Sequence, residues 1–215
     1  MISFPELPDI KLSEPVSTFR LITIIREDSY DEDTSDVDES LTLEDLDRQT
    51  APLDAGMDIV NTTFINSTEG YSRFNDNKNG AWYCALDHDT AVEEKSYHQK
   101  RQLSAMGWDV DGNKKGVVLQ EIFANFTGIF RCAKRLPRGE GILEANLEIY
   151  KDTQKFAEKL RGEGARGIIY PSVRNENGFC LAAFSPEIVQ NVQYGDRWRM
   201  RWNKKGKPIM EKIEL

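Results

Sequence analysis

The stretch GIIYPSVRNENGFCLAAF, residues 167–184, contains two short apolar runs separated by a polar turn. The runs, 167–173 and 179–184, have the length and the aliphatic and aromatic content of strands that lie in a protein core. The segment NENG, residues 175–178, combines the Asn and Gly residues that favour tight turns between antiparallel strands. The stretch therefore predicts a β-hairpin at the centre of the fold.

Further strands and helices are expected on both sides of this hairpin. Strand composition or alternation marks four more segments: 18–26, 81–86, 117–132 as one or two strands, and the tail 193–215 as two polar strands around 203–206. Helix patterns mark two segments: one from a cap at Asp87, Asp89 or Thr90 to about Met106, and one at Lys151–Arg161 with Gly162 just past its end.

The formal net charge of −8 arises in one segment. Between Glu27 and Asp47, 11 of 21 residues are Asp or Glu; without these 11, 25 acidic residues remain against 28 basic ones. The overall charge is therefore no argument against nucleic-acid binding by the rest of the chain. We interpret the acidic segment, 27–47, as a solvated loop, with mimicry of nucleic acid or binding of a basic partner as alternatives. Thr42 near its end could cap a short helix.

Residues 1–15 contain three prolines and predict an extended arm that packs on the body of the protein or on another subunit. The chain has no run of 18 apolar residues and no secretory signal at its start, so neither a membrane span nor export is expected. The three cysteines are odd in number and lie far apart in apolar segments: Cys84, Cys132 and Cys180. Buried free thiols in a reducing cytoplasm are the expected state.

The tail segment 197–205 mixes basic residues with tryptophans, a pattern that occurs in proteins on which nucleic-acid bases stack. We favour a solvated edge strand, with Arg197, Arg199 and Arg201 on one face and Trp198 and Trp202 on the other, in the core. Neither the two histidines nor the cysteines have the spacing of a zinc site, and no metal is expected.

Two blocks carry the candidate site residues. The first contains YSRF (71–74), GAWY (80–83) and TAVEE (90–94), which sets an arginine, a tyrosine and a carboxylate at intervals of 10 and 11 residues. The second is GIIYPSVR, 167–174. Together these blocks resemble the RES-domain family, which is named for its Arg, Glu and Ser, and the resemblance extends over about residues 20–194.

The resemblance implies a mixed α/β (α+β) fold similar to ADP-ribosyltransferases, with a mostly antiparallel split sheet and flanking helices, formed by residues 16–215. It also implies the toxin of a bacterial type II toxin–antitoxin system that causes growth arrest. Such a toxin would break down NAD by cleaving the nicotinamide–ribose bond, through phosphorolysis or hydrolysis. NAD is then a substrate, phosphate a candidate co-substrate, and no cofactor is expected.

Four residues receive roles through the family motif. Arg73 would pair two phosphate oxygens of NAD with its planar fork. Tyr83 would stack on a ring or hydrogen-bond the ribose. Glu94 would accept from a ribose hydroxyl and stabilise the developing cation, and Ser172 would donate or accept close by.

Three choices stay open. Glu93 competes with Glu94, because adjacent helix residues point about 100° apart and one of them faces the site; the family spacing favours Glu94. His98, one turn further on, would support Glu94 or contact substrate. Arg20 and Arg26 are both candidates for a second phosphate ligand, and Arg20 is the better match to the family.

The resemblance further implies an Xre-type helix-turn-helix antitoxin that occludes the active site and through which alone the complex binds operator DNA. A homo-oligomer is an open possibility. Two other functions compete: transfer of ADP-ribose to a protein target, which begins with the same bond cleavage, and a binding module without catalysis. The joint presence of Arg73, Tyr83, Glu94 and Ser172 argues against the binding module.

Overall fold

The computed structural model describes residues 5–26, 55–69, 72–112, 116–137, 141–144 and 147–214. The acidic segment 27–47, with the helix expected at Thr42, lies outside these residues.

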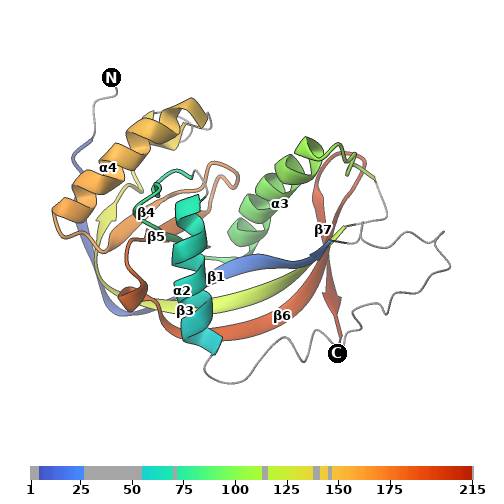
Figure 1. The fold of residues 1–215 in the computed structure, drawn as a ribbon, viewed down its shortest axis with the longest axis horizontal. Helices are drawn as coiled ribbons and strands as arrows, with labels where there is room; N and C mark the ends of the chain where they lie inside the picture. The colour runs from blue at the N-terminus through green and yellow to red at the C-terminus, as the bar shows by residue number, and fades with distance from the viewer. Residues whose placement is uncertain are drawn as a thin grey trace.

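One seven-stranded sheet forms the body of the protein (Figure 1). Its strands are β1 (Asp9–Arg26), β2 (Trp82–Ala85), β3 (Val117–Cys132), β4 (Gly167–Pro171), β5 (Phe179–Ala183), β6 (Gln190–Trp202) and β7 (Pro208–Ile213). They pair in the order β1-β2-β5-β4-β3-β6-β7, and β3–β4 is parallel whereas the other pairs are antiparallel. The expected mixed, mostly antiparallel α+β fold is confirmed. Strand β1 also pairs with β3, which closes β1, β2, β5, β4 and β3 into a ring.

The predicted hairpin at residues 167–184 lies in this ring. Strands β4 and β5 are antiparallel, with Ile169 opposite Leu181, and both of these side chains are buried. The turn is held by Gly178, whose amide donates to the carbonyl of Asn175 over 3.1 Å. The NENG segment therefore folds as its composition predicts.

Strand β1 begins at Asp9, earlier than the expected start at residue 18. Residues 9–12, expected to be part of an extended arm, pair with β3, with Asp9 opposite Arg131. The register shifts between Leu12 and Val16, a segment that contains Pro15. Proline has no amide hydrogen and interrupts the hydrogen bonding between strands. The prolines therefore explain why the sequence pattern did not predict the first part of the strand.

Within the described part of the chain, three helices pack on the sheet: α2 (Ala55–Glu69), α3 (His88–Ala105) and α4 (Tyr150–Gly162). Short 3₁₀ turns lie at Gly141–Leu143, Leu147–Ile149 and Pro186–Ile188. Helices α3 and α4 match the predicted helices, whereas α2 was not predicted. In Figure 1, α2 crosses the sheet between α4 on one side and α3 on the other.

Each helix covers its own part of the core. Val60 of α2 packs in a cluster with Trp82 and Phe126, and Leu103 of α3 packs with Trp202. The indole nitrogen of Trp202 also donates to the Ser96 hydroxyl over 2.8 Å and so anchors α3 to β6. Phe156 of α4 belongs to a third cluster.

The tail forms two strands as predicted, but β6 is not an edge strand. It pairs with β3 on one side and with β7 on the other, so that β7 is the edge. Trp202 is buried as expected, and Trp198 is half-buried. Arg197 was expected in solvent, yet it is buried, because β6 lies inside the sheet and the Arg197 Nε donates to Gln120 Oε1 over 3.2 Å.

The thiols of all three cysteines are free. Cys84 and Cys180 are buried as expected, whereas Cys132, near the end of β3, is half-buried. Among the described residues, no helix is long and apolar enough to cross a membrane.

Candidate active site

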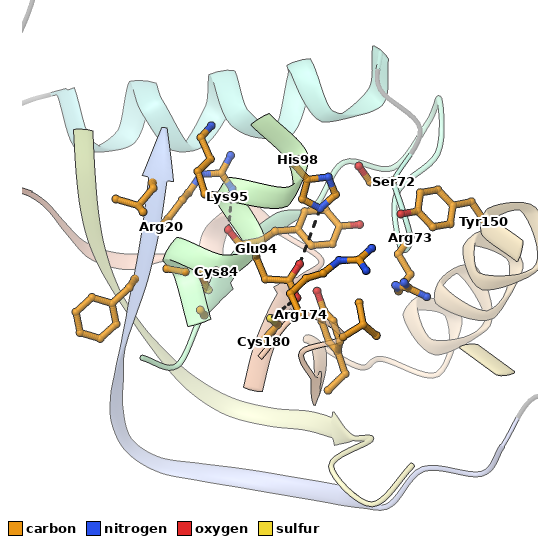
Figure 2. A pocket seen from close by; sticks show the side chains of 17 residues that line it. Arg20, Ser72, Arg73, Cys84, Glu94, Lys95, His98, Tyr150, Arg174 and Cys180 are labelled. Carbon is orange, nitrogen blue, oxygen red and sulfur yellow. Dashed lines mark hydrogen bonds and ion pairs between the residues drawn. The ribbon is translucent and has the colours of Figure 1, made fainter. Parts of the chain in front are cut away.

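A cavity of about 290 Å³ lies between the second half of β1, the 72–73 segment, α3 and the beginning of α4. Figure 2 shows Glu94 near its centre, with Arg73 and Tyr150 on one side and Arg20 and Lys95 on the other. Five of the predicted site residues line this cavity: Arg20, Arg73, Tyr83, Glu94 and His98. The sequence blocks thus meet at one place in the fold.

Glu94 owes its position to the cap of α3. The Asp87 side chain accepts from the amide of Thr90 over 2.8 Å and fixes the first turn of the helix. This register puts Glu94 on the cavity wall, whereas Glu93 does not line the cavity. The Glu94 side chain is 22% exposed, and its Oε2 lies 3.9 Å from Nε2 of His98. The choice between the two glutamates is therefore resolved in favour of Glu94 as the lining residue.

Ser172 lies behind Glu94 rather than in the cavity. It is fully buried, and its hydroxyl donates to Glu94 Oε1 over 2.6 Å. The Ser172 hydroxyl oxygen also accepts from the backbone amides of Arg174 and Asn175, each over 3.0 Å. Because its hydroxyl donates to the carboxylate, Ser172 orients Glu94, and Ser172 itself does not line the cavity.

A chain of hydrogen bonds ties the turn after β4 to the start of α3. The side-chain nitrogen Nδ2 of Asn175 donates to the Thr90 hydroxyl over 2.9 Å, and that hydroxyl donates to the Asp87 carboxylate over 2.8 Å. Gly178 lies against Thr90 so closely that a Cβ there would lie 1.9 Å from its hydroxyl oxygen. Both sequence blocks therefore hold the same carboxylate.

Arg73 lies in the cavity wall with its fork bound to the backbone. Its Nη1 donates to the carbonyl of Ile142 over 2.6 Å and its Nη2 to that of Glu144 over 2.9 Å. Its guanidinium also lies 5.5 Å from the centre of the Tyr150 ring, and the residue is 8% exposed. These contacts fix a positive charge at one end of the cavity.

The hydroxyl of Tyr83 makes its hydrogen bonds with the segment that follows Arg73. It accepts from the amide of Phe74 over 2.8 Å and donates to the Asn75 side chain over 2.7 Å. Burial raises the pKa of Tyr83, so the hydroxyl stays protonated. Tyr83 therefore offers its ring to the cavity, and its hydroxyl supports the fold of residues 73–75.

Arg20 fixes a second positive charge. Its Nη1 donates to the carbonyl of Tyr83 over 2.8 Å, and its guanidinium lies 4.7 Å from the Trp82 ring centre. Desolvation lowers the pKa of Arg20 to about 10, which leaves it charged at neutral pH. Arg26 lies at the far end of β1, where its backbone pairs with Val117, and its side chain lies outside the described residues.

Residues 51–203 match the family model of the RES domain. The chain belongs to the RES-domain family. Among solved structures, the toxin–antitoxin complex MbcT–MbcA of M. tuberculosis contains a chain that is 10% identical, with a TM-score of 0.49 and a match that covers 89% of this chain and 87% of that chain. A comparison with curated proteins finds no match.

Two further cations of this RES domain line the cavity and were not predicted: Lys95 and Arg174. Arg174 is held with its guanidinium 3.3 Å from the centre of the Tyr97 ring. Their positions in the sequence could have predicted this, because Lys95 directly follows Glu94 and Arg174 follows Ser172 by two residues. Tyr150 gave none, since it reaches the site through the packing of α4.

The His98 imidazole and the two cysteine thiols at the site are neutral at pH 7. Desolvation, followed by the positive charges of Arg174 and Arg101, lowers the pKa of His98 to about 4. Burial raises the pKa of the Cys84 thiol to about 12 and that of Cys180 well above its ordinary value. Neither thiol is a ready nucleophile, because the thiolate is the reactive form.

Proposed function

We propose that this RES domain binds NAD in the cavity and cleaves its nicotinamide–ribose bond with the help of Glu94. The observation that supports this most is the charge pattern: one oriented carboxylate lies among four cations, Arg20, Arg73, Lys95 and Arg174. Such a set suits a ligand with a diphosphate and a ribose that becomes positively charged during the reaction.

The chemistry requires little beyond electrostatics. When the bond breaks, its electron pair leaves with nicotinamide, which becomes neutral and needs no proton. The positive charge then develops on the ribose ring, where the Glu94 carboxylate can stabilise it. Ser172 fixes the direction of that carboxylate through its 2.6 Å hydrogen bond, so that the group is already oriented before substrate binds.

The acceptor that attacks the ribose carbon completes the reaction. Water gives ADP-ribose and loses a proton, and a protein side chain gives an ADP-ribosylated target. Inorganic phosphate gives ADP-ribose 1-phosphate, because a hydrogen phosphate dianion can attack through an oxygen that carries no proton. The excess of cations around Glu94 favours an anionic acceptor, and we therefore propose phosphate.

We further propose that the protein is the toxin of a toxin–antitoxin pair and arrests growth by depleting NAD. Family membership supports this role. A helix-turn-helix antitoxin of the Xre type would occlude the cavity, where a carboxylate or a chain end could pair with Arg73 or Arg174, and the complex would bind operator DNA through the antitoxin.

The experiment that tests the reaction is mass analysis of products from purified protein and NAD. With phosphate added, the rate should rise and saturate, and the product should be ADP-ribose 1-phosphate together with nicotinamide. A rate that is indifferent to phosphate, with free ADP-ribose as product, would identify a hydrolase. A protein that gains the mass of ADP-ribose would identify a transferase, and intact NAD would contradict the proposal altogether.

A further inference from the structure

A second cavity, of about 450 Å³, adjoins the first on the side of α2. We call it the α2 cavity. It shares three lining residues with the first cavity, Arg20, Ser72 and Tyr83. The rest of its lining is Ile22, Ile59, Thr62, Thr63, Asn66 and Ala81.

One face of α2 forms a wall of the α2 cavity. Its four lining residues follow the helical spacing i, i+3, i+4 and i+7: Ile59, Thr62, Thr63 and Asn66. Ile59 packs against the core, whereas Thr62 and Asn66 are exposed, so the cavity is apolar at the back and polar at its mouth. Ile65, on another face of the same helix, is 64% exposed and does not line the cavity.

One of the three residues shared by the two cavities is a cation. Arg20 lines both cavities; its Nη1 donates to the carbonyl of Tyr83, and its guanidinium lies over the Trp82 ring. Its Nε is buried and makes no hydrogen bond with any described residue. A buried donor without an acceptor is costly, and an anionic oxygen from a ligand would satisfy it. In Figure 2, Arg20 lies below α2, at the side of the site away from Arg73.

We propose that the α2 cavity holds the adenosine end of NAD and that the diphosphate crosses from one cavity to the other at Arg20. The inference rests on the proposed function, because cleavage by Glu94 puts the nicotinamide riboside end in the first cavity. The adenosine end combines a flat apolar ring with hydroxyl and nitrogen groups. Ile22, Ile59 and Ala81 can cover the ring, and the Thr and Asn side chains can hydrogen-bond its polar groups.

The test compares NAD with nicotinamide mononucleotide, which has the same scissile bond but no adenosine end. Thr63→Trp should fill the α2 cavity, and Ile65→Trp adds the same side chain to the same helix outside it. We expect Thr63→Trp to raise KM for NAD about tenfold or more and to leave cleavage of the mononucleotide within about twofold. Ile65→Trp should match wild type with both substrates.

A binding measurement separates this inference from the proposed function. AMP should bind to wild type and to Glu94→Gln in calorimetry, and bind much more weakly to Thr63→Trp. Asn66→Trp, at the polar mouth of the cavity, replaces Thr63→Trp if that variant does not fold. The assignment of the α2 cavity would be overturned if wild type and Thr63→Trp bound AMP equally well. It would also be overturned if Thr63→Trp impaired cleavage of NAD and of the mononucleotide equally, even though NAD is cleaved by wild type. AMP binding that Thr63→Trp abolishes would support it, even if NAD is not cleaved.

Discussion

At the scale of single residues, the orientation of Glu94 depends on one buried hydroxyl that does not line the cavity. Ser172 donates to Glu94 and accepts two backbone amides, so it joins the turn after β4 to the carboxylate. Replacing it with alanine leaves the carboxylate free to rotate and two amides without their acceptor. We therefore propose that the serine of this family motif acts here as a positioning residue.

We expect Ser172→Ala to lower kcat for NAD by up to about 100-fold with a much smaller change in KM, because misorientation affects the transition state more than binding. The free energy of unfolding should fall by about 1–3 kcal/mol, since buried polar groups lose partners. Steady-state kinetics and urea unfolding measure the two effects. An unchanged kcat in a folded variant would show that Ser172 does not orient Glu94.

His98 supports a prediction about pH. Desolvation and the positive charges of Arg174 and Arg101 lower its pKa in the folded protein below the ordinary histidine value of about 6.5, although 57% of its side chain is exposed. Between the lowered and the ordinary pKa the unfolded chain binds a proton that the folded protein does not, so stability is lost as pH falls through this window. His98→Gln should therefore lose less stability than wild type between pH 7 and pH 5 in urea unfolding. Equal losses would show that His98 titrates normally.

At the scale of the elements, the start of α3 and the turn before β5 form one unit. Gly178 approaches Thr90 so closely that no side chain fits between them, and Thr90 belongs to the cap of the helix that carries Glu94. The docking of this turn against α3 thus determines where the carboxylate lies.

Gly178→Ala tests this docking. The new Cβ would lie 1.9 Å from the Thr90 hydroxyl oxygen, so α3 or the turn must shift, and we expect a loss of about 1–3 kcal/mol together with lower NAD turnover. Gly162→Ala is the matched control, because a Cβ there meets nothing within 4 Å. Urea unfolding of the two variants gives the comparison, and equal stabilities would contradict the tight docking.

The elements also show what could be predicted from sequence. The hairpin at 167–184 and helix α3 have strong local signals, an Asn/Gly turn and an Asp cap, and both were confirmed. Helix α2 has weak ones: it is rich in Asn and Thr, and Val60 is its one fully buried residue among those whose burial is described. Such a helix forms because of tertiary packing, which a local pattern does not contain.

At the scale of the whole molecule, closure of the strand ring brings the site together. Strand β1 pairs with both β2 and β3, which places Arg20 beside Tyr83 and opposite α3. The motif identified Arg73, Tyr83 and Glu94, but their partners are set by this arrangement. The Tyr83 hydroxyl and the Arg73 guanidinium both bind backbone groups, and these contacts join segments that the motif does not relate.

The most direct test of the central claim is NAD turnover by Glu94→Gln and Glu93→Gln, measured as release of nicotinamide. The two variants change adjacent glutamates by the same atoms, and Glu94 alone of the two lines the cavity. We expect Glu94→Gln to lower kcat by about 10²–10⁴-fold, the range typical for a group that stabilises transition-state charge, and Glu93→Gln to match wild type. Turnover that survives in Glu94→Gln, or that is lost in Glu93→Gln instead, would contradict the account.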